Sequence, residues 1–124
     1  MTFCGVNGNL IARIGVSDDG TVFAQFYDRH RPSVSRNGRY VAFATERSLV
    51  GDDTNAVTDI YVQDRDADED GVFDEPDAIS TVLVTRPSSG TGTYSFVAGF
   101  VISADGQHVV FATDNLYTCS SDAQ

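Results

Sequence analysis

An acidic stretch near the middle of the chain holds the residues best suited to chemistry. Asp66, Asp68, Asp70 and Gly71 form the pattern D-x-D-x-D-G, within residues 64–77, where eight of the fourteen residues are acidic. Calcium takes roughly six to eight hard oxygen ligands, and alternate acids on a tight loop supply them. Because so many carboxylates repel one another, this composition favours a bound cation over a solvated loop. We expect a calcium site with a structural rather than a catalytic role.

The spacing of these acids resembles the twelve-residue calcium loop of EF-hand proteins. Gly71 falls at the position of the sharp turn, and Asp77 stands where an EF-hand has a bidentate Glu. A shorter side chain there predicts weak binding, with a Kd of about 10⁻⁴ to 10⁻³ M. The flanking segments favour strands rather than helices, so the loop is expected between two strands. The expected ligands are, in loop order, Asp66, Asp68, Asp70, the carbonyl oxygen of Val72, Asp74 and Asp77.

A second polar group, residues 51–55 together with Asp59, is a weaker candidate. Its sequence, Gly-Asp-Asp-Thr-Asn, is rich in residues whose side chains hydrogen-bond to nearby backbone groups. We expect Asx-type turns here rather than a second metal site.

Residues that would support catalysis or cofactor binding are missing or isolated, so we expect none of either. All eight basic residues are Arg, which excludes a lysine Schiff base and a P-loop lysine. The pattern G-x-S-x-G does not occur, and the Ser- and Gly-rich residues 88–94 favour a flexible connection over a phosphate-binding loop. His108 is expected to be packed. Residues 28–31 (Asp-Arg-His-Arg) favour a surface loop, with the polar mouth of a channel as the alternative.

Charge and hydropathy exclude several classes of partner. The formal net charge is −10, and such an acidic field repels phosphate backbones, which argues against nucleic-acid binding. The longest apolar runs, such as residues 40–44, are too short to span a bilayer. The N-terminus lacks the basic and apolar segments of a signal peptide. With 124 residues, 41% of them hydrophobic, the chain predicts one small globular domain.

The elements that must position the acidic loop are short strands. Apolar runs rich in Val, Ile, Phe and Tyr alternate with Gly, Asn, Asp and Ser, and no segment keeps a helical period. Val41 and Phe43 are expected on one face of their strand and Tyr40, Ala42 and Ala44 on the other, with both faces covered. The Asn-Gly and Asp-Gly pairs at 7–8, 37–38 and 105–106 favour tight hairpin turns with positive φ angles. The expected strands are residues 3–6, 10–16, 32–35, 39–45, 59–64, 79–85, 99–103 and 107–113.

The chain also contains an internal repeat. Residues 35–45 (SRNGRYVAFAT) recur as residues 103–113 (SADGQHVVFAT), and six of the eleven positions are identical. The two copies have an offset of 68 residues, the separation of Gly38 and Gly106. Residues 11–17 align with residues 79–85 at the same offset. Such self-similarity is typical of repeat architectures.

The repeat unit resembles the blade of TolB-type β-propellers. The resemblance lies in residues 32–45, then 49–55 (LVGDDTN), then 59–65 (DIYVQDR), and it covers most of residues 10–116. It implies an all-β fold of four-stranded antiparallel blades that pack around a central channel. The whole chain, 1–124, then forms one partial propeller domain. It comprises a half blade at 1–17, a full blade at 32–85 with the calcium loop at 64–77, and a half blade at 98–116.

A propeller ring needs about four to eight blades, so one chain is too short to close it. The two half blades are complementary, and the N-terminal hairpin of one chain is expected to complete the C-terminal sheet of a neighbour. We expect a cyclic homo-oligomer, most simply a trimer of about six blades. Cys4 and Cys119 are expected to approach across the subunit boundary, where an inter-chain disulfide is one possibility and two unrelated thiols another.

These features favour a non-enzymatic binding or scaffold module that is stabilised by calcium. The family resemblance implies a protein or glycan partner, and together with the calcium loop it suggests an extracellular or periplasmic location. Two alternatives stay open. One is a hydrolase or lyase whose site at the channel rim repeats Asp28, His30 and Arg31 from several chains. The other is an excised fragment of a larger propeller without independent activity.

Overall fold

The described part of the chain is an all-β structure. The computed structural model describes residues 2–3, 12–18, 30–85 and 97–113. These ranges contain strands and no helix, as the sequence predicted. The strands are β1 (Thr2–Phe3), β2 (Ala12–Arg13), β3 (Ser33–Val34), β4 (Tyr40–Thr45), β5 (Asp59–Asp64), β6 (Ser80–Leu83), β7 (Val97–Ile102) and β8 (Val109–Thr113).

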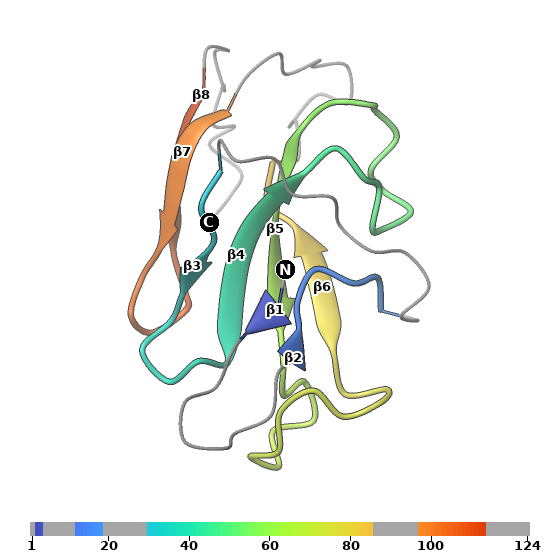
Figure 1. Cartoon of the computed structure of the whole chain (residues 1–124), viewed down its shortest axis with the longest axis vertical. Coiled ribbons are helices and arrows are strands. Elements are labelled where there is room, and N and C mark those ends of the chain that lie inside the picture. Colours follow the sequence, from blue (N-terminus) through green and yellow to red (C-terminus); the bar gives the residue numbers. More distant parts are fainter. Residues whose placement is uncertain (1, 4–11, 19–29, 86–96, 114–124) are drawn as a thin grey trace, which may run out of the picture.

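The central element is an antiparallel sheet of four consecutive strands, in the order β3-β4-β5-β6 (Figure 1). Its longest pairing joins β4 to β5 over six residue pairs, from Tyr40 opposite Asp64 to Thr45 opposite Asp59. Two smaller antiparallel sheets, β1-β2 and β7-β8, accompany it. All strands of the central sheet fall within residues 32–85, the range expected for one repeat unit.

One face of the central sheet carries the larger core. Val41 and Phe43 from β4 and Tyr61 from β5 are fully buried there, and the rings of Phe43 and Tyr61 stack at a centroid distance of 5.9 Å. Alternation along β4 sends Ala44 to the opposite face, where it packs against Ile60. The expectation that β4 is covered on both faces is therefore confirmed. The other buried members of the larger core are Ile14, Leu49 and Leu83.

The N-terminal segment lies along β5 and β6 on this face. The side-chain Oε1 of Gln63 accepts hydrogen bonds from the backbone nitrogens of Gly15 at 2.7 Å and Val16 at 3.4 Å. The hydroxyl of Thr81 donates to the carbonyl of Val16 at 3.0 Å, and its backbone nitrogen donates to Asp18 at 2.7 Å. Polar side chains on the sheet thus satisfy the backbone of the segment that covers them.

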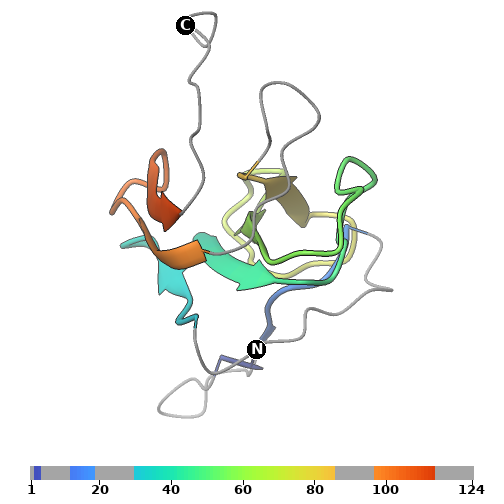
Figure 2. The same cartoon turned by 90° about the horizontal axis from the view of Figure 1, so that it is seen from above.

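The hairpin of β7 and β8 covers the opposite face. Phe100, Val109 and Phe111 pack against Ala44 and Ile60. The contact continues along β3, where the nitrogen of Ile102 donates to the hydroxyl of Ser33 at 3.1 Å. Figure 2 shows β7 and β8 on the opposite side of β4 from β1 and β2. The molecule is therefore a stack of three layers, with the four-stranded sheet in the middle.

The two repeated turns have the same hydrogen bonds. The hydroxyl of Ser35 accepts from the nitrogen of Tyr40, and Asn37 Oδ1 accepts from Arg39 at 3.1 Å. The same bonds recur in the second turn, where Asp105 takes the place of Asn37. Positive φ occurs only at the glycines of these turns, Gly38 at 78° and Gly106 at 77°. Asn37 and Asp105 are thus hydrogen-bond acceptors, not the positive-φ residues that the sequence predicted, because each turn spans more than two residues.

Other sequence predictions differ from the structure or lie outside the described residues. His108 is exposed, not packed, because side-chain alternation turns it away from the central sheet that its neighbour Val109 contacts. Asn7, Gly8, Cys4, Cys119, Asp28, Arg29 and residues 88–94 lie outside the described ranges. No described helix is long and apolar enough to cross a membrane.

Candidate metal centre

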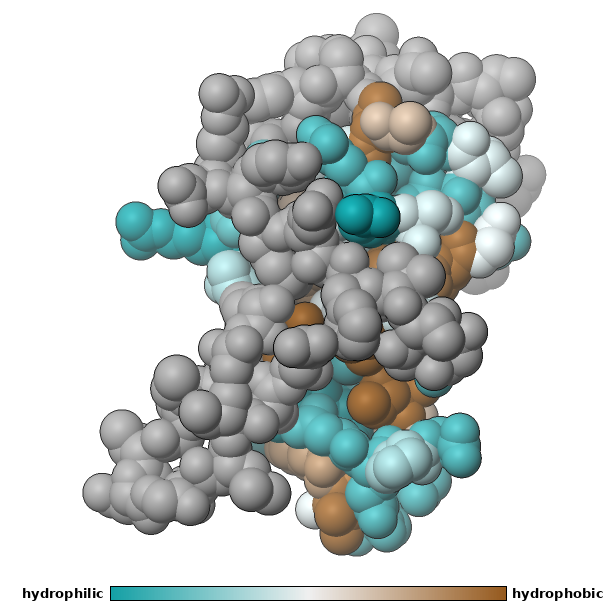
Figure 3. Space-filling model, turned by 45° about the vertical axis from the view of Figure 1, so that its right-hand side comes forward, coloured by the Kyte–Doolittle hydropathy of each residue, from teal (hydrophilic) through white to brown (hydrophobic). Residues whose placement is uncertain are grey.

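The acidic loop joins β5 to β6 and is closed at its base by backbone hydrogen bonds. The nitrogen of Ala67 donates to the carbonyl of Ala78 at 2.9 Å, and the nitrogen of Asp74 donates to the carbonyl of Arg65 at 2.8 Å. The loop lies at the lower end of the molecule in Figure 1, and this end is largely hydrophilic in the space-filling view (Figure 3). The loop is therefore anchored at its ends and open to solvent at its tip.

Three of the expected ligands converge in this loop. Carboxylate oxygens of Asp66, Asp68 and Asp70 all lie within 4.8 Å of one another. Asp66 is only 5% exposed, whereas Asp68 and Asp70 are exposed. Alternate spacing brings the three side chains to one side of a tight turn, as the sequence predicted. The convergence suits a hard cation, because the repulsion of three close carboxylates is relieved by positive charge.

Backbone groups of the turn hold two of these carboxylates. The nitrogen of Gly71 lies 3.2 Å from both carboxylate oxygens of Asp66, and the nitrogen of Val72 donates to Asp70 at 2.8 Å. Gly71 has a φ of 89°, so the expected sharp turn is present at this glycine. A side chain at this position would be strained, since L residues rarely adopt this conformation.

Asp74, another of the expected ligands, is paired with Arg65. Both of its carboxylate oxygens accept hydrogen bonds from the guanidinium of Arg65, the first from Nε at 2.8 Å and the second from Nη2. Arg65 also donates to the carbonyl of Gly38 at 2.9 Å, and its guanidinium carbon lies 5.0 Å from the centroid of the Phe73 ring. This cluster fixes the second half of the loop without a metal.

The last two expected ligands lie on the same loop. The side chain of Val72 is exposed, and the expected ligand atom of this residue is its backbone carbonyl oxygen. Asp77 is exposed and has a φ of 67°, one of three non-glycine residues of the loop with positive φ, together with Glu69 and Asp74. The group of carboxylates within 4.8 Å does not include Asp77. Its role as a ligand stays a prediction.

Glu75 is an acidic residue of the loop that was not among the expected ligands. The negative charge of Asp70, then burial, then the charges of Asp68 and Asp66 raise the pKa of Glu75. The group of carboxylates within 4.8 Å of one another does not include Glu75. In the sequence, Glu75 lies between two expected ligands, Asp74 and Asp77, and the twelve-residue spacing assigns it no ligand role.

The strand before the loop ends in an ion pair. Arg39 Nε and Nη2 lie 2.7 and 2.8 Å from the two carboxylate oxygens of Asp64. Asp64 Oδ1 also accepts from the nitrogen of Asp66 at 3.0 Å. Burial opposes ionisation of Asp64, but the hydrogen bonds from Arg39 and Asp66 outweigh it and lower the pKa of Asp64. Asp64 is thus ionised, paired and unsuited to a metal.

The second polar group forms turns, as predicted. Asp53 Oδ1 accepts from the nitrogen of Asn55 at 3.3 Å, and Asn55 Oδ1 accepts from the nitrogen of Val57 at 2.9 Å. These are Asx-type bonds. Asp53 also accepts from the hydroxyl of the buried Tyr61. Asp59 is fully buried, accepts from the hydroxyl of Thr85 at 2.5 Å, and has a pKa raised by burial. These contacts tie the loop to β5.

The chemistry of the loop is that of cation binding. Asp66, Asp68 and Asp70 offer only carboxylate oxygens, which suit calcium or magnesium better than softer metals. Comparison with protein-family models, with curated proteins and with solved structures finds no match for this chain.

Proposed function

We propose that this chain is a non-enzymatic binding or scaffold module of β-propeller-type blades, stabilised by calcium in the β5–β6 loop. The observation that carries the proposal is the convergence of Asp66, Asp68 and Asp70 within 4.8 Å at the positions of a D-x-D-x-D-G motif. Calcium would link these carboxylates across the loop and hold the connection between β5 and β6 in one conformation.

The stacked layers support the blade-like part of the proposal. Propeller blades are four-stranded antiparallel sheets, and β3-β4-β5-β6 is such a sheet with consecutive strand order. Its two faces are covered by other segments of the repeat, residues 14–18 on one side and β7-β8 on the other. We propose that copies of the chain close a ring, most simply a trimer, whose loops bind a protein or glycan in an extracellular or periplasmic setting.

Calcium titration of the metal-free protein tests the site. We expect calcium to raise the melting temperature, with a Kd of about 10⁻⁴ to 10⁻³ M by calorimetry. At ten to one hundred times the Kd, the gain in unfolding free energy is about 1.4–2.7 kcal/mol. Asp68→Asn should abolish this gain. Glu46→Gln, which neutralises an exposed acid outside the loop, should preserve it. A melting temperature that calcium leaves unchanged would refute the site.

Light scattering coupled to size-exclusion chromatography tests the assembly. We expect a defined oligomer, with the mass of three chains for the simplest ring. A single species with the mass of one chain over the whole concentration range would refute the ring but leave the calcium site standing, because the metal ligands all come from one loop.

A further inference from the structure

The layers of the molecule contact one another through repeat-related residues. Val41 and Phe43 face the N-terminal segment, where they pack with Ile14. Their counterparts at the offset of 68, Val109 and Phe111, face the central sheet in the same way. Each layer therefore presents the same positions to the layer before it in the chain.

Strand pairing follows the same repeat. Within β1-β2, Thr2 lies opposite Arg13 and Phe3 lies opposite Ala12. Within β5-β6, Gln63 lies opposite Thr81 and Asp64 lies opposite Ser80. Arg13 and Ala12 are the counterparts of Thr81 and Ser80 at the offset of 68. Thr2 and Phe3 are therefore the counterparts of Gln63 and Asp64, so β1-β2 corresponds to the outer half of the central sheet.

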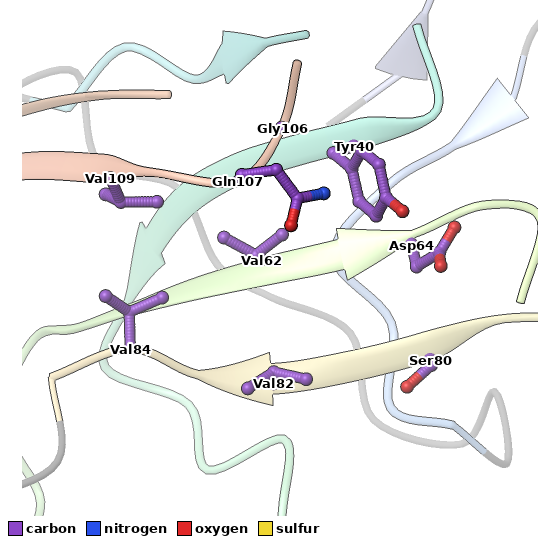
Figure 4. Close-up of a pocket in the computed structure, with 9 residues that line it drawn as sticks. All are labelled: Tyr40, Val62, Asp64, Ser80, Val82, Val84, Gly106, Gln107 and Val109. Atoms are coloured by element: carbon purple, nitrogen blue, oxygen red, sulfur yellow. The ribbon is translucent and has the colours of Figure 1, made fainter. Parts of the chain in front are cut away.

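An apolar groove lies beside β8, where an outer half is missing from the β7-β8 sheet. The groove has a volume of about 450 Å³ (Figure 4). Val62, Val82 and Val84 line it from the central sheet, and Gln107 and Val109 line it from the hairpin. In the described part of the chain, β8 pairs with β7 alone, whereas its counterpart β4 has strands on both sides. The groove is thus the space beside an incomplete sheet.

The burial of repeat-related residues indicates what covers this groove. Ile14 and Val16 are 1% and 7% exposed, because they face the outer strands of the central sheet. Their counterparts Val82 and Val84 line the groove, and Val82 is 55% exposed. The same positions are therefore buried in one layer contact and uncovered in the next. The chain's own N-terminal segment is bound on the opposite face through Gln63, so it does not fill the groove.

We propose that β1 and β2 of a second copy fill the groove, with β1 of that copy pairing with β8. This inference rests on the proposed function, since it takes the repeat units as blades. The register follows from the pairing of β4 with β5, where Val41 lies opposite Gln63 and Tyr40 opposite Asp64. In the second copy, Thr2 then lies opposite Val109 and Phe3 opposite His108.

The docked segment continues a contact that already exists within one chain. Val84 and Val109 line the groove and also belong to the packed cluster between the hairpin and the central sheet. A second copy would extend this layer outward over Val82, which is 55% exposed within one chain. Each copy uses its N-terminus once and its groove once, so the contact is head-to-tail, and it closes into a ring when the rotation between copies divides a full turn.

Substitution in the groove tests the contact. Val82→Arg places a charge in the docking surface at a position that is half exposed in the single chain, so folding should persist. We expect at least a tenfold loss of self-association by sedimentation. Val34→Arg adds the same charge on β3, at the opposite edge of the same sheet, and should leave association unchanged. Equal association of the two variants would overturn the proposal.

Cysteine cross-linking tests the register, in a background where Cys4 and Cys119 are replaced by Ser. Phe3→Cys and His108→Cys, made on separate chains and mixed, should form a disulfide-linked dimer on a non-reducing gel. Antiparallel neighbours lie about 4.5–5.5 Å apart between Cα atoms, which suits a disulfide. Val34→Cys mixed with His108→Cys should form far less. A double variant on one chain that cross-links only within monomers would overturn the proposal.

These outcomes separate the inference from the proposed function. A wild-type chain that stays monomeric would refute both the ring and the docking site. A wild-type oligomer whose Phe3→Cys and His108→Cys variants do not cross-link would refute only the docking register. The calcium titration is independent of both results.

Discussion

Gly106 lies directly against the ring of Tyr40 (Figure 4). A Cβ atom added at Gly106 would lie only 2.1 Å from Cδ2 of that ring. The contact joins the turn of β7 and β8 to the start of β4. Gly38, the repeat counterpart of Gly106, has more space, since its nearest neighbours, Arg65 and Phe73, would be 3.8 Å from an added Cβ. The two equivalent turns thus differ in what surrounds their glycines.

Alanine at these two glycines should therefore have unequal effects. Both have φ near 78°, so Gly38→Ala and Gly106→Ala share a backbone cost of about 1–2 kcal/mol. Gly106→Ala also forces the Tyr40 ring or the hairpin to move, which adds about 1–3 kcal/mol. Urea unfolding of both variants measures the difference. Equal losses would show that the hairpin does not pack on Tyr40 as described.

Asp74 and Asp68 should separate the metal-free stability of the loop from its response to calcium. In EDTA, Asp74→Asn should lose about 1–3 kcal/mol of unfolding free energy, because the partly buried guanidinium of Arg65 loses a charged partner. Asp68 is exposed and near two like charges, so Asp68→Asn should cost nothing in EDTA. With excess calcium, Asp68→Asn should lose the metal-dependent gain. Thermal melts in EDTA and in excess calcium measure both effects. If Asp68→Asn were less stable than Asp74→Asn in EDTA, this division would be wrong.

Asp59 and Asp64, at the two ends of β5, should give opposite pH dependences. Burial raises the pKa of Asp59, so its stabilising contribution is complete below the ordinary value of 3.8 and is lost as the pH rises through the folded-state pKa. Asp59→Asn keeps an oxygen for the Thr85 hydroxyl and carries no charge. It should therefore be more stable than the wild type at neutral pH, with the difference disappearing in acid.

The sign reverses for Asp64, which serves as the control. Hydrogen bonds from Arg39 lower the pKa of Asp64 despite its burial, so its contribution is present above the ordinary value of 3.8 and is lost as the pH falls through the folded-state pKa. Asp64→Asn should be less stable than the wild type at neutral pH and should approach it in acid. Unfolding free energies between about pH 3 and 8 test both variants. Parallel curves would contradict the assigned environments.

Local features of the sequence predicted the elements and the main cluster. Alternating apolar residues in β4 and β5 and the turn residues between them predicted the strands, because strand period and turn preference depend on neighbours in the chain. The spacing of Asp66, Asp68 and Asp70 likewise predicted their convergence, since one tight turn brings them together. The repeat likewise predicted turns at the equivalent positions 37–38 and 105–106.

Contacts between distant residues were decided only by the tertiary structure. The pairing of Asp74 with Arg65 and the exposure of His108 do not follow from spacing along the chain. They depend on how the β5–β6 loop folds back on itself and on where one layer ends over the next. The groove beside β8 also depends on the tertiary structure, because it forms only once the hairpin is stacked on the central sheet.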